Sequence, residues 1–143
     1  MDQLIALHER KLALLKQKKQ RYLQKLFPQK DAKMPQLRFK GFNDVWHKIP
    51  LKQTIVKEWK GKVKEKDLTS GKVIYLDTEY LNNCNNAFYS NAKKDVENYD
   101  ILILWDGSNA GTVYSHVNGA LGSTLKAYQI NKDKYNSEFI YQN

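Results

Sequence analysis

The sequence has little cysteine and no long apolar run. Its 143 residues include one cysteine, Cys84, which excludes an internal disulfide framework and a zinc cluster built on cysteines. No apolar stretch approaches the roughly 20 residues that a membrane-spanning helix needs. The first residues also lack the basic leader and apolar core of a signal peptide. We therefore expect a chain that enters no membrane and works in the reducing cytoplasm.

Acidic side chains are scarce in the first part of the chain. Residues 1–40 hold eleven Lys and Arg but three Asp and Glu, a net charge of +8, whereas residues 41–143 contribute +1 of the +9 total. This asymmetry predicts a polyanion or a partner with an acidic face near the N-terminal segment. The alternative is a solvated helix face that binds nothing.

Residues 2–27 are predicted to form one helix, because good helix formers dominate and neither Gly nor Pro interrupts them. Apolar side chains recur at heptad spacing, with His8 and Lys19 as polar members, and Pro28 ends the helix. A lone helix of this length needs something to pack on, so the seam predicts a partner helix. The pairing residues are Ile5, Leu12, Leu15, Tyr22 and Leu26. The basic residues Lys16, Lys18, Lys19 and Arg21 face either a DNA backbone or a protein partner.

The remaining sequence predicts a linker at 28–36 and a mainly β domain at 37–143, so the fold class is α+β. Runs rich in β-branched and aromatic residues predict strands, and the continuous apolar run at 100–106 predicts a buried central strand. The strand segments are 72–77, 86–90, 100–106, 111–117 and 119–130. Residues 134–143 are expected to begin a helix.

The loop GSNAGT at 107–112 invites a catalytic or nucleotide-binding interpretation. It lacks the Lys and the spacing of a phosphate-binding P-loop, and a β-like run follows it. Its two glycines favour a hairpin turn, with Asp106 and Asn109 bonding to local N–H groups. A hydrolytic set of Asp106, Ser108 and His116 is the alternative, although no nucleophile elbow is present.

Two segments suit DNA better. Lysines spaced two apart after Trp59 would line one face of an extended chain and contact phosphates, unless they only protect an edge strand. The predicted phosphate contacts are Lys60, Lys62, Lys64 and Lys72. Asparagine amides can read adenine in the major groove, although Asn-rich segments also form simple turns. The predicted base readers are Asn82, Asn83, Asn85, Asn86, Ser108 and Asn109.

Four blocks of the sequence match a known family. They are LHERKLALLKQKKQRYLQKLFPQ, PQLRFKGFNDVW, DILILWDGSNAGTVY and GALGSTLKAY, in this order. Together they resemble the specificity (S) subunit of type I restriction–modification systems, over essentially the whole chain. The first block is similar to the family's conserved spacer helix, and the others to a target recognition domain.

The resemblance implies a non-catalytic subunit that reads double-stranded DNA. In the family, S subunits recruit a modification subunit, which methylates adenine with S-adenosylmethionine, and a restriction subunit, which cleaves with ATP and Mg²⁺. The chain itself would need no cofactor. We expect contact with the modification subunit, indirect contact with the restriction subunit, and a possible homodimer through the N-terminal helix.

In the family, a full S subunit has two target recognition domains and two conserved helices, whereas this chain has one helix and one domain. The resemblance therefore implies a recognition domain that is incomplete at its C-terminus, in a half-gene, a recombination cassette or a fragment. Two interpretations follow: a DNA-reading half-subunit, or an interaction module whose helix binds S or modification subunits without reading DNA.

Overall fold

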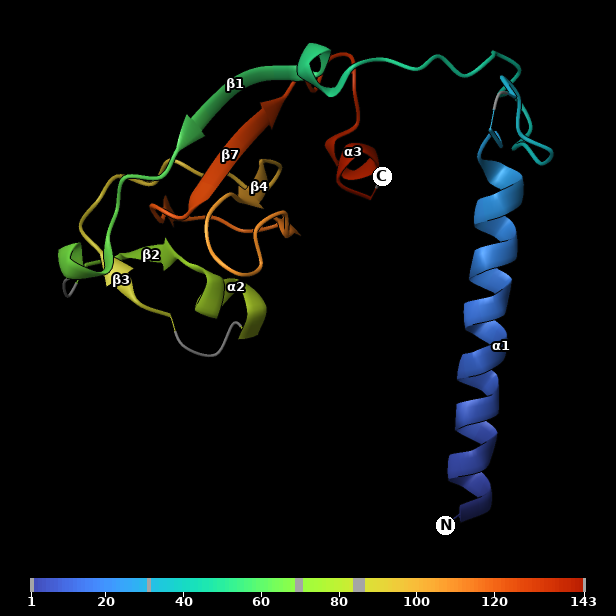
Figure 1. The fold of residues 1–143 in the computed structure, drawn as a ribbon, viewed down its shortest axis with the longest axis horizontal. Helices are drawn as coiled ribbons and strands as arrows, with labels where there is room; N and C mark the ends of the chain where they lie inside the picture. Colours follow the sequence, from blue (N-terminus) through green and yellow to red (C-terminus); the bar gives the residue numbers. More distant parts are fainter. Residues whose placement is uncertain (1, 31, 69–70, 84–86, 143) are drawn as a thin grey trace. The chain divides into compact units, whose positions relative to one another are not determined.

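The computed structural model describes residues 2–30, 32–68, 71–83 and 87–142 (Figure 1). The chain divides into two compact units, Met1–Ile49 and Pro50–Asn143. Each unit has its own pattern of burial and charge.

The first unit is dominated by the helix α1 (Asp2–Leu26), which confirms the predicted helix. Its last backbone hydrogen bond runs from Phe27 N to Leu23 O, and Pro28 cannot continue the series. None of residues 3–30 and 32–49 is buried. Apart from the half-buried Leu26, the large apolar side chains of α1 are between 40% and 62% exposed, namely Leu4, Ile5, Leu7, Leu12, Leu14, Leu15, Tyr22 and Leu23. The helix thus leaves its apolar stripe unpacked within its own unit.

The segment after α1 folds back on the end of the helix. Leu37 N donates to Lys25 O at 2.9 Å, and the rings of Phe27 and Trp46 lie 5.6 Å apart. Arg38 holds the following turn by donating to the carbonyl oxygen of Phe42 at 2.9 Å. Residues 37–49, which the sequence analysis assigned to the recognition domain, therefore belong by contact to the first unit.

The second unit contains a four-stranded antiparallel sheet in the order β1–β7–β4–β5. The strands are β1 (Ile55–Lys60), β7 (Leu125–Ile130), β4 (Ile101–Leu104) and β5 (Val113–Tyr114). As the apolar run predicted, β4 lies inside the sheet, with Ile101, Leu102 and Leu104 buried. β1 lies at the sheet's edge and is rich in charge, which suits an edge strand.

A smaller sheet packs against the first and closes the core. Its order is β3 (Tyr89–Ser90), β2 (Val73–Leu76) and β6 (Ala120–Leu121), with β2 parallel to β6. The core cluster draws on both sheets and consists of Leu76, Val96, Leu102, Leu104, Leu121, Leu125 and Ala127. Short helical segments connect the strands: η1 (Leu51–Gln53), η2 (Glu65–Asp67), α2 (Thr78–Asn83) and α3 (Ser137–Gln142).

The two short α-helices are each capped by a side chain at the N-terminus. Asp77 Oδ1 accepts from Tyr80 N at 2.7 Å at the start of α2, and Asn136 Oδ1 accepts from Phe139 N at 2.9 Å at the start of α3. The predicted helix start near residue 137 is confirmed. Asn82 and Asn83, expected in a loop, lie instead at the end of α2, because the Asp77 cap starts a helix there.

A close backbone approach fixes the point where the chain leaves β1. Gly61 N donates to Leu125 O at 3.0 Å, and a Cβ on Gly61 would lie 1.9 Å from the carbonyl oxygen of Gly122. Only glycine fits this contact. The C-terminal end of β1 is therefore held against the turn between β6 and β7.

Candidate nucleic-acid interface

Two lysines face each other at one end of the four-stranded sheet. Lys60 on β1 pairs directly with Lys126 on β7, so the two side chains share the face that points away from the core. Like charges in this arrangement destabilise a sheet unless something offsets them. The pair therefore concentrates positive charge at this end of the sheet.

Each of the two ammonium groups has a different neighbour. Lys126 Nζ lies 3.3 Å from Glu58 Oε2 and 5.1 Å from the ring centroid of Tyr128. The pKa of Lys126 is raised above its ordinary value, first by Tyr128 and then by Glu58. Lys60 Nζ lies 4.1 Å from the ring centroid of Trp105. The repulsion within the pair is thus offset by an ion pair on one side and a cation–π contact on the other.

The hairpin loop between β4 and β5, residues 105–112, rises at the same end of the sheet. Leu104 N donates to Thr112 O at 2.9 Å, and Gly111 N donates to Leu104 O at 2.8 Å. Gly107 and Gly111 adopt φ values of +100° and +97°, which confirms the hairpin that the two glycines predicted. Ser108 and Asn109, the predicted base readers of this loop, are exposed within it.

Trp105 anchors the root of this hairpin, and its position differs from the prediction. It was included in the buried strand run, but it follows β4 and is 44% exposed. Its indole Nε1 donates to Ser123 O at 3.2 Å, and its backbone N donates to Thr124 O at 3.1 Å. These bonds fix the indole ring beside Lys60. The two residues are distant in the sequence, so no local pattern predicts their contact.

The other predicted phosphate contacts lie beyond the end of β1 or before β2. Lys60, Lys62 and Lys64 are exposed and alternate with half-buried Gly61 and Val63, although β1 ends at Lys60. Val63 N donates to Leu121 O at 3.4 Å, so the chain remains extended beside the β6–β7 turn. Lys72 is exposed directly before β2. The first three lysines thus continue the basic end of the sheet.

The asparagine cluster is divided between described and undescribed residues. Asn82 Oδ1 accepts a hydrogen bond from the hydroxyl of Tyr114 on β5 at 3.1 Å, which ties α2 to the strand beside the hairpin. This bond fixes the amide orientation and leaves its N–H groups as donors. Asn83 is exposed at the end of the helix. Asn85 and Asn86 lie outside the described residues.

The contacts of His116 do not favour the hydrolytic alternative. His116 Nε2 lies 2.8 Å from Glu138 Oε2 on α3, and its ring is edge-on to Tyr141 at 5.9 Å. Asp106 Oδ1 accepts from the backbone N of Gly107, as expected for a turn residue. The structure thus places His116 with α3 and Asp106 in the turn.

Two further features bear on the chemistry open to the chain. Across the ranges that the structure describes, no group of three His, Cys, Asp or Glu side chains is arranged to hold a metal ion. Among the helices in those ranges, none is long and apolar enough to cross a membrane.

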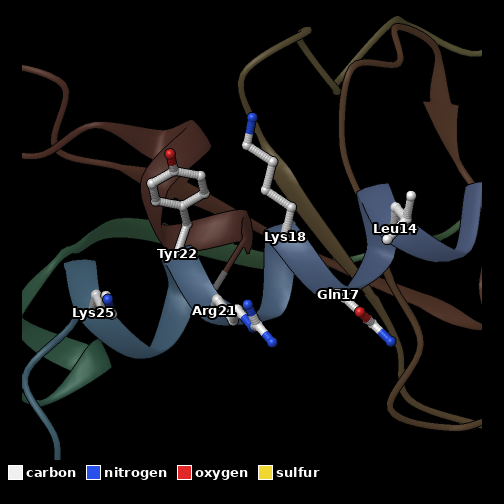
Figure 2. A pocket seen from close by; sticks show the side chains of 6 residues that line it. All are labelled: Leu14, Gln17, Lys18, Arg21, Tyr22 and Lys25. Atoms are coloured by element: carbon white, nitrogen blue, oxygen red, sulfur yellow. The ribbon is translucent and has the colours of Figure 1, made fainter. Parts of the chain in front are cut away.

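The helix α1 carries a basic and partly apolar hollow of its own. Its lining comes from Leu14, Gln17, Lys18, Arg21, Tyr22 and Lys25, and Figure 2 shows Lys18 and Tyr22 projecting side by side. Lys18 Nζ lies 5.9 Å from the ring centroid of Tyr22. All six residues come from one helix, so the hollow is an open surface of α1.

Part of the chain is similar in sequence to a known protein. The chain is 45% identical over 62 residues to the type I restriction enzyme MjaVIII specificity subunit of Methanocaldococcus jannaschii, an alignment of 41% of this chain and 15% of the relative. No family model matches the chain. No solved structure matches it. The chain thus spans about 15% of the length of its curated relative, and the similarity supports the resemblance to type I specificity subunits.

Proposed function

We propose that the chain recognises double-stranded DNA as a specificity subunit, or half-subunit, of a type I restriction–modification complex. The observation that carries this proposal is the 45% identity to a type I specificity subunit. The basic end of the four-stranded sheet supports it, because an exposed lysine row beside a rigid polar hairpin suits a duplex.

In this proposal the two kinds of side chain have different tasks. Lys60, Lys62, Lys64 and Lys72 contact phosphates and give affinity, joined by Lys126, which the sequence analysis did not single out. Ser108, Asn109 and Asn82 carry donors and acceptors that can distinguish base edges, as would Asn83, Asn85 and Asn86. The hairpin supports such a role because its backbone is fixed at both ends by hydrogen bonds.

The chemistry on DNA would belong to partner subunits. The chain is then not an enzyme: a modification subunit would bring S-adenosylmethionine and methylate adenine. A restriction subunit, held indirectly, would bring ATP and Mg²⁺ and cleave. α1 would pair with another helix through Ile5, Leu12, Leu15, Tyr22 and Leu26, either in a second copy of the chain as a coiled coil or in a partner subunit.

A second function is favoured by the exposed apolar stripe of α1. The leucines of α1 from Leu4 to Leu23 are 40–62% exposed, so a partner can pack on them whether or not the second unit reads DNA. The chain would then be an interaction module that binds specificity or modification subunits and blocks or titrates them.

Co-expression with the cognate modification subunit separates these functions. The DNA-reading function predicts a stable complex in a pull-down and a new methylated adenine motif in the host DNA. A stable complex with no new motif would favour the interaction module. The absence of any complex would contradict both proposals. As a control, Leu12→Asp with Leu15→Asp should abolish the complex, because two buried carboxylates disrupt a helix seam.

A further inference from the structure

One contact of the second unit links the edge of the sheet to the root of the hairpin. Lys60 lies on β1 and Trp105 follows β4, and the strand β7 separates β1 from β4 in the sheet. The 4.1 Å between Lys60 Nζ and the Trp105 ring centroid therefore spans the middle strand. The contact ties two segments that the backbone ladder does not join directly.

Both partners of this contact are constrained from elsewhere. The carbonyl oxygen of Ser123 accepts from Trp105 Nε1 and fixes the ring plane. The ammonium of Lys126, directly across from Lys60, repels the Lys60 side chain, and Glu58 holds Lys126 in place at 3.3 Å. The Lys60 ammonium is thus attracted to the Trp105 ring and repelled by Lys126, its cross-strand neighbour.

We propose that Lys60 positions the 105–112 hairpin for base reading by holding Trp105, in addition to supplying one positive charge near the phosphates. Lys60 then differs in kind from Lys62, which is exposed two residues later on the same extended segment. The inference rests on the proposed DNA-reading function and deepens it, since it names the residue on which the loop's orientation depends. Ser108 and Asn109 present their side chains from a backbone whose root Lys60 stabilises.

The test compares two lysines of equal charge and different contacts. Lys60→Met and Lys62→Met both remove one ammonium, and Lys60→Arg keeps a cation that can stack on the indole ring. Each full-length variant is measured against a random pool of duplex oligonucleotides, once for affinity as a function of salt and once for the sequences it selects. Both Met variants should lower the salt slope by about 0.9, the value for one phosphate contact.

The two variants should differ in sequence preference. Lys60→Met should lower the ratio of affinities for selected and random duplexes by about 2- to 30-fold, the range that corresponds to a cation–π contact. Lys62→Met should leave this ratio unchanged, and Lys60→Arg should restore it. Equal ratios for Lys60→Met and Lys62→Met would overturn the positioning role.

A second readout needs no DNA and separates this inference from the proposed function. In the free chain, Lys60→Met should speed hydrogen exchange at the amides of Leu104 and Gly111, which close the hairpin, and Lys62→Met should not. If the wild-type chain selects no sequence, the proposed function fails and the reading role fails with it. If exchange is unchanged in Lys60→Met, the holding contact itself is overturned.

Discussion

The two units of the chain differ in how they satisfy their apolar side chains. The second unit buries Leu76, Leu102, Leu121 and Leu125 completely between two sheets. The first unit, over residues 3–30 and 32–49, buries none, and its leucines remain exposed along α1. A core stabilises a unit by itself, whereas an exposed stripe is stabilised only when something covers it.

Charge separates the two units in the same way. Residues 1–49 carry twelve Lys and Arg against four Asp and Glu, whereas residues 50–143 carry twelve against eleven. The first unit therefore attracts a polyanion or an acidic surface as a whole. The second unit is nearly neutral, and its positive charge matters where it is concentrated, at Lys60 and Lys126. This difference fits the proposed roles, in which the first unit associates with a partner and the second makes selective contact with DNA.

The largest expected effect comes from the core of the second unit. Leu76→Ala should lower the free energy of unfolding of this unit by about 2–5 kcal/mol, because a fully buried side chain leaves a cavity. Amide hydrogen exchange in β4 and β7 measures this change. The matched variant Leu12→Ala on α1 should change it by less than about 0.5 kcal/mol. Equal effects of the two variants would contradict the division into a self-sufficient and a dependent unit.

A smaller effect is expected where the backbones of the second unit meet. Gly61→Ala should lower the free energy of unfolding of the second unit by about 1–3 kcal/mol. The added Cβ would lie 1.9 Å from the carbonyl oxygen of Gly122, so the β6–β7 turn would have to move. Thermal unfolding followed by near-ultraviolet circular dichroism is a suitable measurement. Gly41 in the first unit has open space around it and a φ of +95°. Gly41→Ala therefore strains only the first unit and should leave the unfolding temperature of the second unit unchanged.

The smallest expected effect depends on pH. Asp100 is buried, its Oδ2 accepts from Glu97 N at 2.8 Å, and burial raises its pKa, an effect that the Glu97 hydrogen bond reduces. A carboxyl with a raised pKa in the folded state contributes stability that is fully present below the ordinary Asp value of about 4. That contribution is lost as the pH rises through the raised value.

Asp100→Asn should therefore gain stability relative to the wild type as the pH rises above the ordinary Asp pKa of about 4, because this contribution is lost from the wild type. Urea unfolding at a series of pH values measures the difference. Parallel curves for Asp100→Asn and the wild type would show that burial of Asp100 does not act on stability as described.

The sequence predicted the parts of this structure that local patterns determine. A run of good helix formers without Gly or Pro located α1, the continuous apolar run located β4 inside the sheet, and Gly107 with Gly111 located the hairpin. α2 was missed because four asparagines suggested a loop, whereas the cap at Asp77 starts a helix. Local composition and capping gave opposite indications, and the cap prevailed.

The candidate site was predicted less completely than the fold. Lys60 was singled out from its spacing, but Trp105, Lys126 and Tyr114 were not. Their relation to Lys60 and Asn82 arises from strand register and from contacts across the sheet, which a single sequence does not specify. The alternation of Lys126 and Tyr128 along β7 was the one local signal that could have indicated a basic and aromatic face.

Selection from a random duplex pool tests most directly the claim that this chain reads DNA sequence. The full chain is incubated with the pool at increasing salt, and the retained duplexes are sequenced. We expect an enriched motif that persists as salt rises and that is lost in a Ser108→Ala, Asn109→Ala variant. Retention of all sequences alike, with affinity falling steeply in salt, would contradict the claim and leave a chain that binds DNA only through its charge.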